Sequence, residues 1–173
     1  MRVFSAHDVL RFAIRIEENG EVFYREAARV VSDQGVKEFF GRLATEELGH
    51  KRTFEAILAS LGDYQPSETY EGEYLAYLQE YIDGKAIFKE HDAERGGRER
   101  TTPHEEFRGP ELTPVSDTRS AFDFAIQREM DSIVYYQELR AFVPEKHHPT
   151  VDRVVDEERR HFSLLSEMKK TYR

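Results

Sequence analysis

The sequence carries one short pattern twice, as Glu47-Leu48-Gly49-His50 and as Glu158-Arg159-Arg160-His161. In each copy the glutamate and the histidine are three residues apart, so on a helix both side chains project from one face. A single pair of this kind in a glutamate-rich chain usually marks two surface residues. Because the pair recurs, each time within an apolar stripe of helical period, a shared internal site is the better interpretation.

The similarity extends to the segments that precede the two copies. Residues 12–17 (FAIRIE) match residues 124–129 (FAIQRE), and a tyrosine follows each final glutamate after seven residues, as Tyr24 and Tyr136. The spacing from that glutamate to the E-x-x-H glutamate is also nearly the same in both halves. Such a repeat predicts two copies of a helical hairpin related by a pseudo-twofold axis.

Local signals predict where the four helices begin and end. Ser5-Ala6-His7-Asp8 forms a capping box at the start of the first helix, and residues 32–35 (SDQG) separate it from the second, which ends at Gly62. The third helix continues to Pro144, which stops it because proline lacks the amide hydrogen. Pro149 suits the first position of the fourth helix.

The fold class that follows is all-α: a four-helix bundle with a long crossover between the second and third helices. We expect a single domain over residues 1–173, with helical hairpins at 5–62 and 118–173. The crossover spans 63–117 and contains a short helix at 73–83. A connection of that length joins two antiparallel hairpins across the whole bundle.

Six side chains on the core-facing stripes are candidate metal ligands: Glu17, Glu47, His50, Glu129, Glu158 and His161. Burying even one bare carboxylate costs several kcal/mol, and no lysine or arginine is expected on the stripes to neutralise the four. Two divalent cations would balance their charge. The sequence therefore predicts a two-metal centre at the bundle axis.

Composition excludes several other classes of function. The formal net charge of −9 argues against nucleic acid as a partner. The chain has no cysteine, which excludes disulfides, thiolate zinc sites and iron–sulfur clusters within it. No leader segment and no apolar run long enough to span a membrane are visible, so we expect a cytoplasmic protein without a membrane partner.

At these residues the sequence resembles the rubrerythrin branch of the ferritin-like di-iron superfamily, in particular its short members without a rubredoxin domain. Ferritin-like proteins use this ligand set of two single glutamates and two E-x-x-H pairs. The resemblance implies a di-iron centre, with zinc or manganese as alternative metals. It also implies that Glu47 and Glu158 bridge the metals, that Glu17 and Glu129 are terminal ligands, and that the partners are an electron-donor protein and a second copy of the chain.

Three hypotheses of function follow, of which the third is a purely structural bundle that holds zinc and pairs with a partner. In the first, the protein is an oxidoreductase that reduces hydrogen peroxide or dioxygen, and the hydroxyls of Tyr24 and Tyr136 hydrogen-bond the ligands or supply an electron. In the second, it binds and handles iron like a ferroxidase, without peroxidase turnover. Rubrerythrins carry an extra glutamate where this chain has Ser132. Ser132 and Gly20 are expected to leave room for the oxidant, and Glu46 and Glu157 are expected to be solvated neighbours of the ligands.

Overall fold

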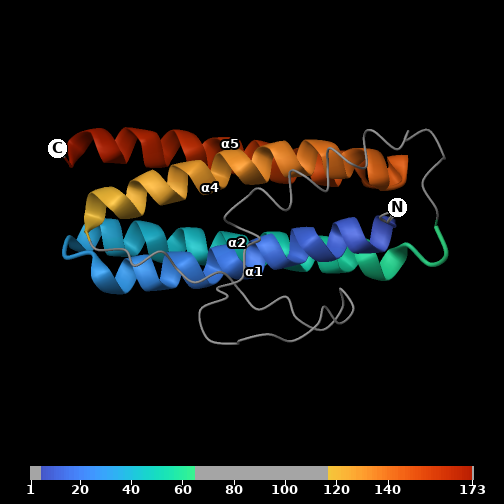
Figure 1. Ribbon diagram of the computed structural model, residues 1–173, viewed down its shortest axis with the longest axis horizontal. Helices are drawn as coiled ribbons and strands as arrows, with labels where there is room; N and C mark the ends of the chain where they lie inside the picture. Colours follow the sequence, from blue (N-terminus) through green and yellow to red (C-terminus); the bar gives the residue numbers. More distant parts are fainter. Residues whose placement is uncertain (1–4, 65–116, 173) are drawn as a thin grey trace, which may run out of the picture.

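A computed structural model describes residues 5–64 and 117–172 of the chain, which form four long helices and no strand. The helices pack as two antiparallel hairpins that lie against each other along their length (Figure 1). They are α1 (Ala6–Val30), α2 (Gln34–Ser60), α4 (Thr118–Leu139) and α5 (His148–Thr171), with the short 3₁₀ helices η2 (Arg140–Phe142) and η3 (Glu145–His147) between α4 and α5.

The direction of the helices confirms the crossover. α2 ends at the end of the bundle where α1 begins, whereas α4 begins at the opposite end (Figure 1). The chain between them must therefore return along the bundle, a distance of roughly 40 Å for a helix of 27 residues such as α2. The connection itself, with the short helix predicted at 73–83, lies outside the described residues.

Side-chain caps set the starts of α1, α2 and α4, whereas α5 begins without one. Ser5 and Asp8 form the predicted capping box, in which the Ser5 hydroxyl accepts from the Asp8 amide at 3.2 Å. Asp33 caps α2 by accepting from the Val36 amide at 2.9 Å. Asp117 and Ser120 form a second capping box at the start of α4, which the sequence analysis did not predict.

The ends of the second hairpin differ from the prediction in two details. α4 was expected to run to Pro144, but its last turn tightens into the 3₁₀ helix η2 after Leu139. Pro149 is the second residue of α5 rather than the first, because the helix already begins at His148. Both changes leave the register of the E-x-x-H pair unaffected.

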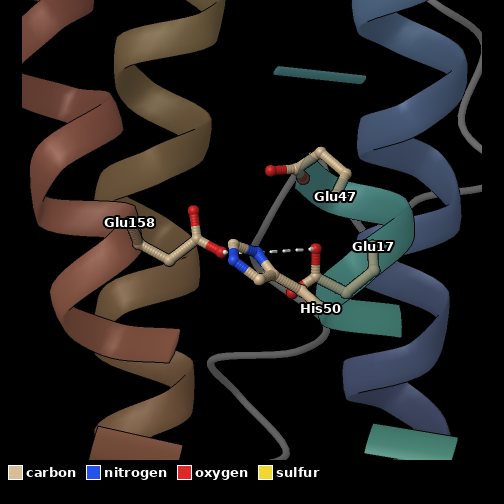
Figure 2. Close-up of side chains that lie close together, drawn as sticks. All are labelled: Glu17, Glu47, His50 and Glu158. Atoms are coloured by element: carbon tan, nitrogen blue, oxygen red, sulfur yellow. Dashed lines mark ion pairs between the residues drawn. The ribbon is translucent and has the colours of Figure 1, made fainter. Parts of the chain in front are cut away.

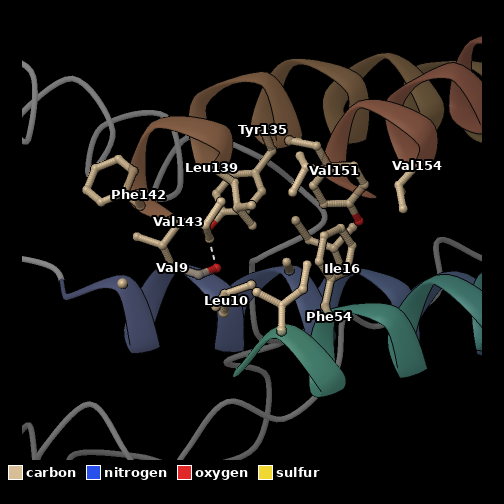
Figure 3. Packing of buried hydrophobic residues seen from close by; sticks show 14 of the residues in the cluster. Val9, Leu10, Ile16, Phe54, Tyr135, Leu139, Phe142, Val143, Val151 and Val154 are labelled. Carbon is tan, nitrogen blue, oxygen red and sulfur yellow. Dashed lines mark hydrogen bonds between the residues drawn. The ribbon is translucent and has the colours of Figure 1, made fainter. Parts of the chain in front are cut away.

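The apolar core is divided into two clusters, one toward each end of the bundle (Figure 3 shows the first). The first contains Leu10, Ile16, Phe54, Tyr136 and Val154 among others. The second contains Phe23, Tyr24, Phe40, Phe122 and Leu165 among others. Along every helix the candidate ligands fall between these two clusters, so they form a polar layer near the middle of the bundle. No helix in the two described stretches is long and apolar enough to cross a membrane.

Candidate metal centre

The structure brings all six candidate ligands together inside the bundle. None of them is more than 3% exposed. They form two overlapping groups of four, in each of which one ligand atom per residue lies within 4.8 Å of the others. The groups are Glu17, Glu47, His50 and Glu158 (Figure 2), and Glu47, Glu129, Glu158 and His161. The two E-x-x-H glutamates are therefore shared, and each single glutamate and each histidine belongs to one group.

Both imidazoles turn the same ring nitrogen inward. Nδ1 of His50 lies 2.9 Å from Oε1 of Glu158 and 3.7 Å from Oε2 of Glu17. Nδ1 of His161 lies 3.3 Å from Oε2 of Glu158 and 3.7 Å from Oε1 of Glu47. The two rings stack with their centroids 5.6 Å apart. Donor atoms from all four helices thus face one small volume.

Most of these inward-facing atoms lack a hydrogen-bond partner. They are Oε2 of Glu17, Oε1 of Glu47, both carboxylate oxygens of Glu158 and Nδ1 of each histidine. An unsatisfied buried polar atom costs about 1–3 kcal/mol, and more if it is charged. Carboxylates and imidazoles are the ligands that iron, manganese and zinc share in proteins. The residues present therefore fit a pair of divalent cations.

The outer nitrogen of each histidine is held by a glutamate from the opposite hairpin. Nε2 of His50 lies 2.7 Å from Oε2 of Glu157, and Nε2 of His161 lies 2.6 Å from Oε2 of Glu46. The expectation that Glu46 and Glu157 are merely solvated is wrong, because these half-exposed side chains reach across to the rings. A carboxylate in this place keeps the proton on Nε2 and directs Nδ1 toward the centre.

Tyr24 and Tyr136 make a matching pair of contacts. The Tyr24 hydroxyl donates to Oε1 of Glu129, and the Tyr136 hydroxyl donates to Oε1 of Glu17. Burial and the nearby carboxylates raise the pKa of both phenols well above the usual value. Each tyrosine therefore stays protonated and fixes one single glutamate from the other hairpin.

One basic side chain contradicts the sequence analysis. Arg128 is 3% exposed, and its Nη2 donates to Oε2 of Glu47 at 3.1 Å and to the carbonyl oxygen of Ile16 at 2.8 Å. The expectation that no arginine reaches the carboxylates is wrong. So is the expectation that Gly20 leaves room for an oxidant, because a Cβ there would collide with Arg128 and Glu47. Arg128 could not be predicted from the helical stripe, because it precedes Glu129 and does not lie on the stripe. Its long side chain nevertheless extends to the centre.

Crowding of charge shifts the protonation of the metal-free centre. Burial and repulsion from Glu158 raise the pKa of Glu129 to about 8, and burial and the same repulsion raise that of Glu47. Burial alone would lower the pKa of His161, but the neighbouring carboxylates of Glu129 and Glu158 raise it to about 11. Without metal, protons therefore occupy the positions that cations would take, and metal binding must release them.

Comparisons with known proteins agree with this geometry. The rubrerythrin family profile matches residues 8–86, which contain most of α1 and all of α2. A crystal structure from Thermotoga maritima, provisionally described as a ferritin-like diiron-carboxylate protein, is 27% identical. The match covers 100% of this chain and 99% of that one, with a TM-score of 0.67. No curated protein matches the sequence. The chain therefore has a ferritin-like fold, and its first hairpin is similar to the rubrerythrins.

Proposed function

We propose that the protein is a non-haem di-iron oxidoreductase that reduces hydrogen peroxide or dioxygen with electrons from an external donor protein. The observation that carries the proposal is the set of buried ligand atoms without hydrogen-bond partners, arranged as two overlapping groups. The proposed iron ligands are Glu17, Glu47, His50, Glu129, Glu158 and His161. By family resemblance we expect the protein to act as a homodimer.

The surroundings of the centre support a small oxidant. The six ligands are almost completely buried, so only a small molecule could approach the space between them. Two ferrous ions, when bound, supply the two electrons that convert hydrogen peroxide and two protons into two waters. The carboxylates favour the more highly charged oxidised state, since negative charge stabilises positive charge most strongly in a buried site.

The protein's own groups have defined tasks in this reaction. Tyr24 and Tyr136 hold the single glutamates in place through their hydroxyl hydrogens, and they are the aromatic groups nearest to the carboxylates for a transfer of an electron. Glu46 and Glu157 orient the imidazoles and keep their protons on Nε2. These contacts limit reorganisation of the site when its charge changes, which is what a redox centre requires.

One observation favours iron handling as the second candidate function. Ser132, which occupies the position of the extra rubrerythrin glutamate, is buried and offers no carboxylate to the centre. A centre with only six ligands holds its oxidised iron less firmly. The protein would then oxidise ferrous iron and release it, without turning over peroxide.

Stopped-flow mixing of the anaerobic diferrous protein with each oxidant tests the proposal. We expect peroxide to oxidise the centre faster than dioxygen, and two iron ions to remain per chain after desalting. Glu17→Gln should lower the bound iron, whereas the matched control Glu18→Gln should not. Glu18 is paired instead with Lys51 at 2.8 Å on the surface. Slow oxidation by peroxide with loss of iron would establish iron handling instead.

A further inference from the structure

Arg128 breaks the symmetry of an otherwise paired centre. The tyrosine contacts and the glutamate–histidine contacts each occur twice, once from each hairpin. In the repeat, the counterpart of Arg128 is Ile16, an apolar residue whose carbonyl oxygen accepts from the guanidinium. The guanidinium therefore places a fixed positive charge on one side of the centre, in contact with α1.

The two shared glutamates consequently offer different numbers of free oxygens. Oε2 of Glu47 accepts from Arg128, which leaves Oε1 as its one atom without a partner. Both oxygens of Glu158 are without a hydrogen-bond partner, and they lie near Nδ1 of His50 and Nδ1 of His161 respectively. Glu158 can thus serve each group with a different oxygen that has no hydrogen-bond partner, whereas Glu47 has one such oxygen while Arg128 holds Oε2.

Gly20 is the residue that makes this contact fit. A Cβ at position 20 would overlap Nη2 and Cζ of Arg128 and Oε2 of Glu47. The colliding atoms are the ends of flexible side chains, so an alanine at this position would displace the ion pair without blocking the fold. The contact between Arg128 and Glu47 therefore requires a glycine at position 20.

We propose that Arg128 is a positioning residue that withholds Oε2 of Glu47 from the metals and makes the two metal positions unequal. Glu158 would then offer both of its oxygens to the pair of metals, whereas Glu47, although it belongs to both groups, would offer only Oε1 without a competing contact. The weaker position is the one formed with Glu17 and His50, because the remaining oxygen of Glu47 faces His161 and the guanidinium contacts α1. The inference rests on the proposed two-metal centre.

Titration of the full-length metal-free protein with Co²⁺, followed by calorimetry and by the absorbance of bound cobalt, tests the inference. The wild type should bind two ions in two separate steps. Arg128→Met removes the charge at similar size, and it should tighten the weaker step by about tenfold or more, a normal magnitude for an outer contact of a metal ligand. Arg128→Lys keeps the positive charge, so it should preserve part of the difference in Co²⁺ affinity between the two steps.

Gly20→Ala provides a second variant that does not remove the arginine. It should tighten the weaker step in the wild-type background and change it less in the Arg128→Met background, where the added Cβ still meets Oε2 of Glu47 but no longer displaces an arginine. Gly41→Ala is the matched control, since a Cβ there would meet nothing within 4 Å.

The outcomes separate the inference from the proposed function. Binding of fewer than two Co²⁺ by the wild type would overturn both. Two equal steps in the wild type, or two steps that neither variant changes, would overturn the role of Arg128 and leave the two-metal centre intact. Weaker binding in Arg128→Met would show that the arginine prepares Glu47 as a ligand, which contradicts the proposal.

Discussion

At the scale of single residues, the centre depends on contacts that cross between the hairpins. Glu46 lies on α2 and bonds to His161 on α5, whereas Glu157 lies on α5 and bonds to His50 on α2. Arg160 also pairs with Glu46 at 2.7 Å. Each carboxylate is half exposed, so it contacts solvent on one side and a buried ring on the other.

Neutralising one of these carboxylates should weaken metal binding without removing a ligand. We expect Glu46→Gln to lower the affinity for Co²⁺ by about 10–100-fold, because His161 loses the charge that orients its ring and strengthens it as a ligand. A binding isotherm for the purified protein measures this. Glu38→Gln is the control, since Glu38 is an exposed residue of the same helix and accepts from the side-chain amide of Gln34 at 2.9 Å. Equal affinities in the two variants would contradict this role for Glu46.

The sequence predicted the residues that lie on helical stripes and missed those that reach the centre from outside them. Glu17 and His50 could be placed because their spacing puts them on the buried face of a helix. Glu46 and Arg128 precede a ligand by one residue, a position that normally faces away from the core. Their contacts depend on side-chain length and on the distance between helices, which the spacing of residues does not specify.

At the scale of elements, the helix starts are set by short side chains. α1 and α4 occupy equivalent places in the two hairpins, and both begin with a capping box. The first was visible in the sequence because Ser5 and Asp8 are typical of the motif. The second was not recognised because Asp117 and Ser120 reverse the usual order of hydroxyl and acid.

Removal of the α4 cap should destabilise the protein by about 1 kcal/mol. The Asp117 side chain accepts from the Ser120 amide at 2.9 Å, and Asp117→Ala leaves that amide without a protein partner. Asp117→Asn keeps an acceptor at the same place and should cost little. Urea denaturation of both variants in the same metal state measures the difference. Similar losses of unfolding free energy in Asp117→Ala and Asp117→Asn would mean that the charge of Asp117 matters rather than its hydrogen bond.

At the scale of the whole molecule, the buried carboxylates of the candidate metal centre lower the stability of the bundle. A layer of four buried carboxylates divides what would otherwise be one continuous apolar core. The four-helix architecture and the direction of the crossover could be predicted, because the stripes and the length of the connection leave few alternatives. The course of the crossover could not, since residues 84–117 show no regular apolar spacing.

The metal-free protein should be most stable near pH 4.5, the ordinary pKa of a glutamate, below which the contribution of Glu158 is lost and above which that of Glu129 is lost. The pKa of Glu129 is raised to about 8 and that of His161 to about 11, so the protons they bind stabilise the fold at low pH. That contribution is lost as pH rises through these values. Burial raises the pKa of Glu158, but the neighbouring imidazoles of His161 and His50 outweigh it and lower that pKa, so its contribution is lost below pH 4.5, the ordinary value. Melting temperatures of the metal-free protein should therefore fall between about pH 6 and pH 9.

The metal-loaded protein should show the opposite trend over the same range. Cations must displace the protons from Glu129 and His161, so the stabilisation that they give increases with pH. Parallel melting curves of the two forms, with the metal concentration held constant, make the comparison. The same pH dependence in both forms would contradict the assignment of these residues to the centre.

The single arginine has a consequence for how such a protein can diversify. Two identical hairpins that associated as separate chains would have to place every residue twice, so an arginine at this position would enter the centre from both sides. Joining the hairpins in one chain removes that constraint, because each copy can change alone. Arg128 opposite Ile16 is a change of this kind. The covalent tandem therefore permits two neighbouring metal positions with different properties, which a strictly symmetric pair of hairpins could not provide.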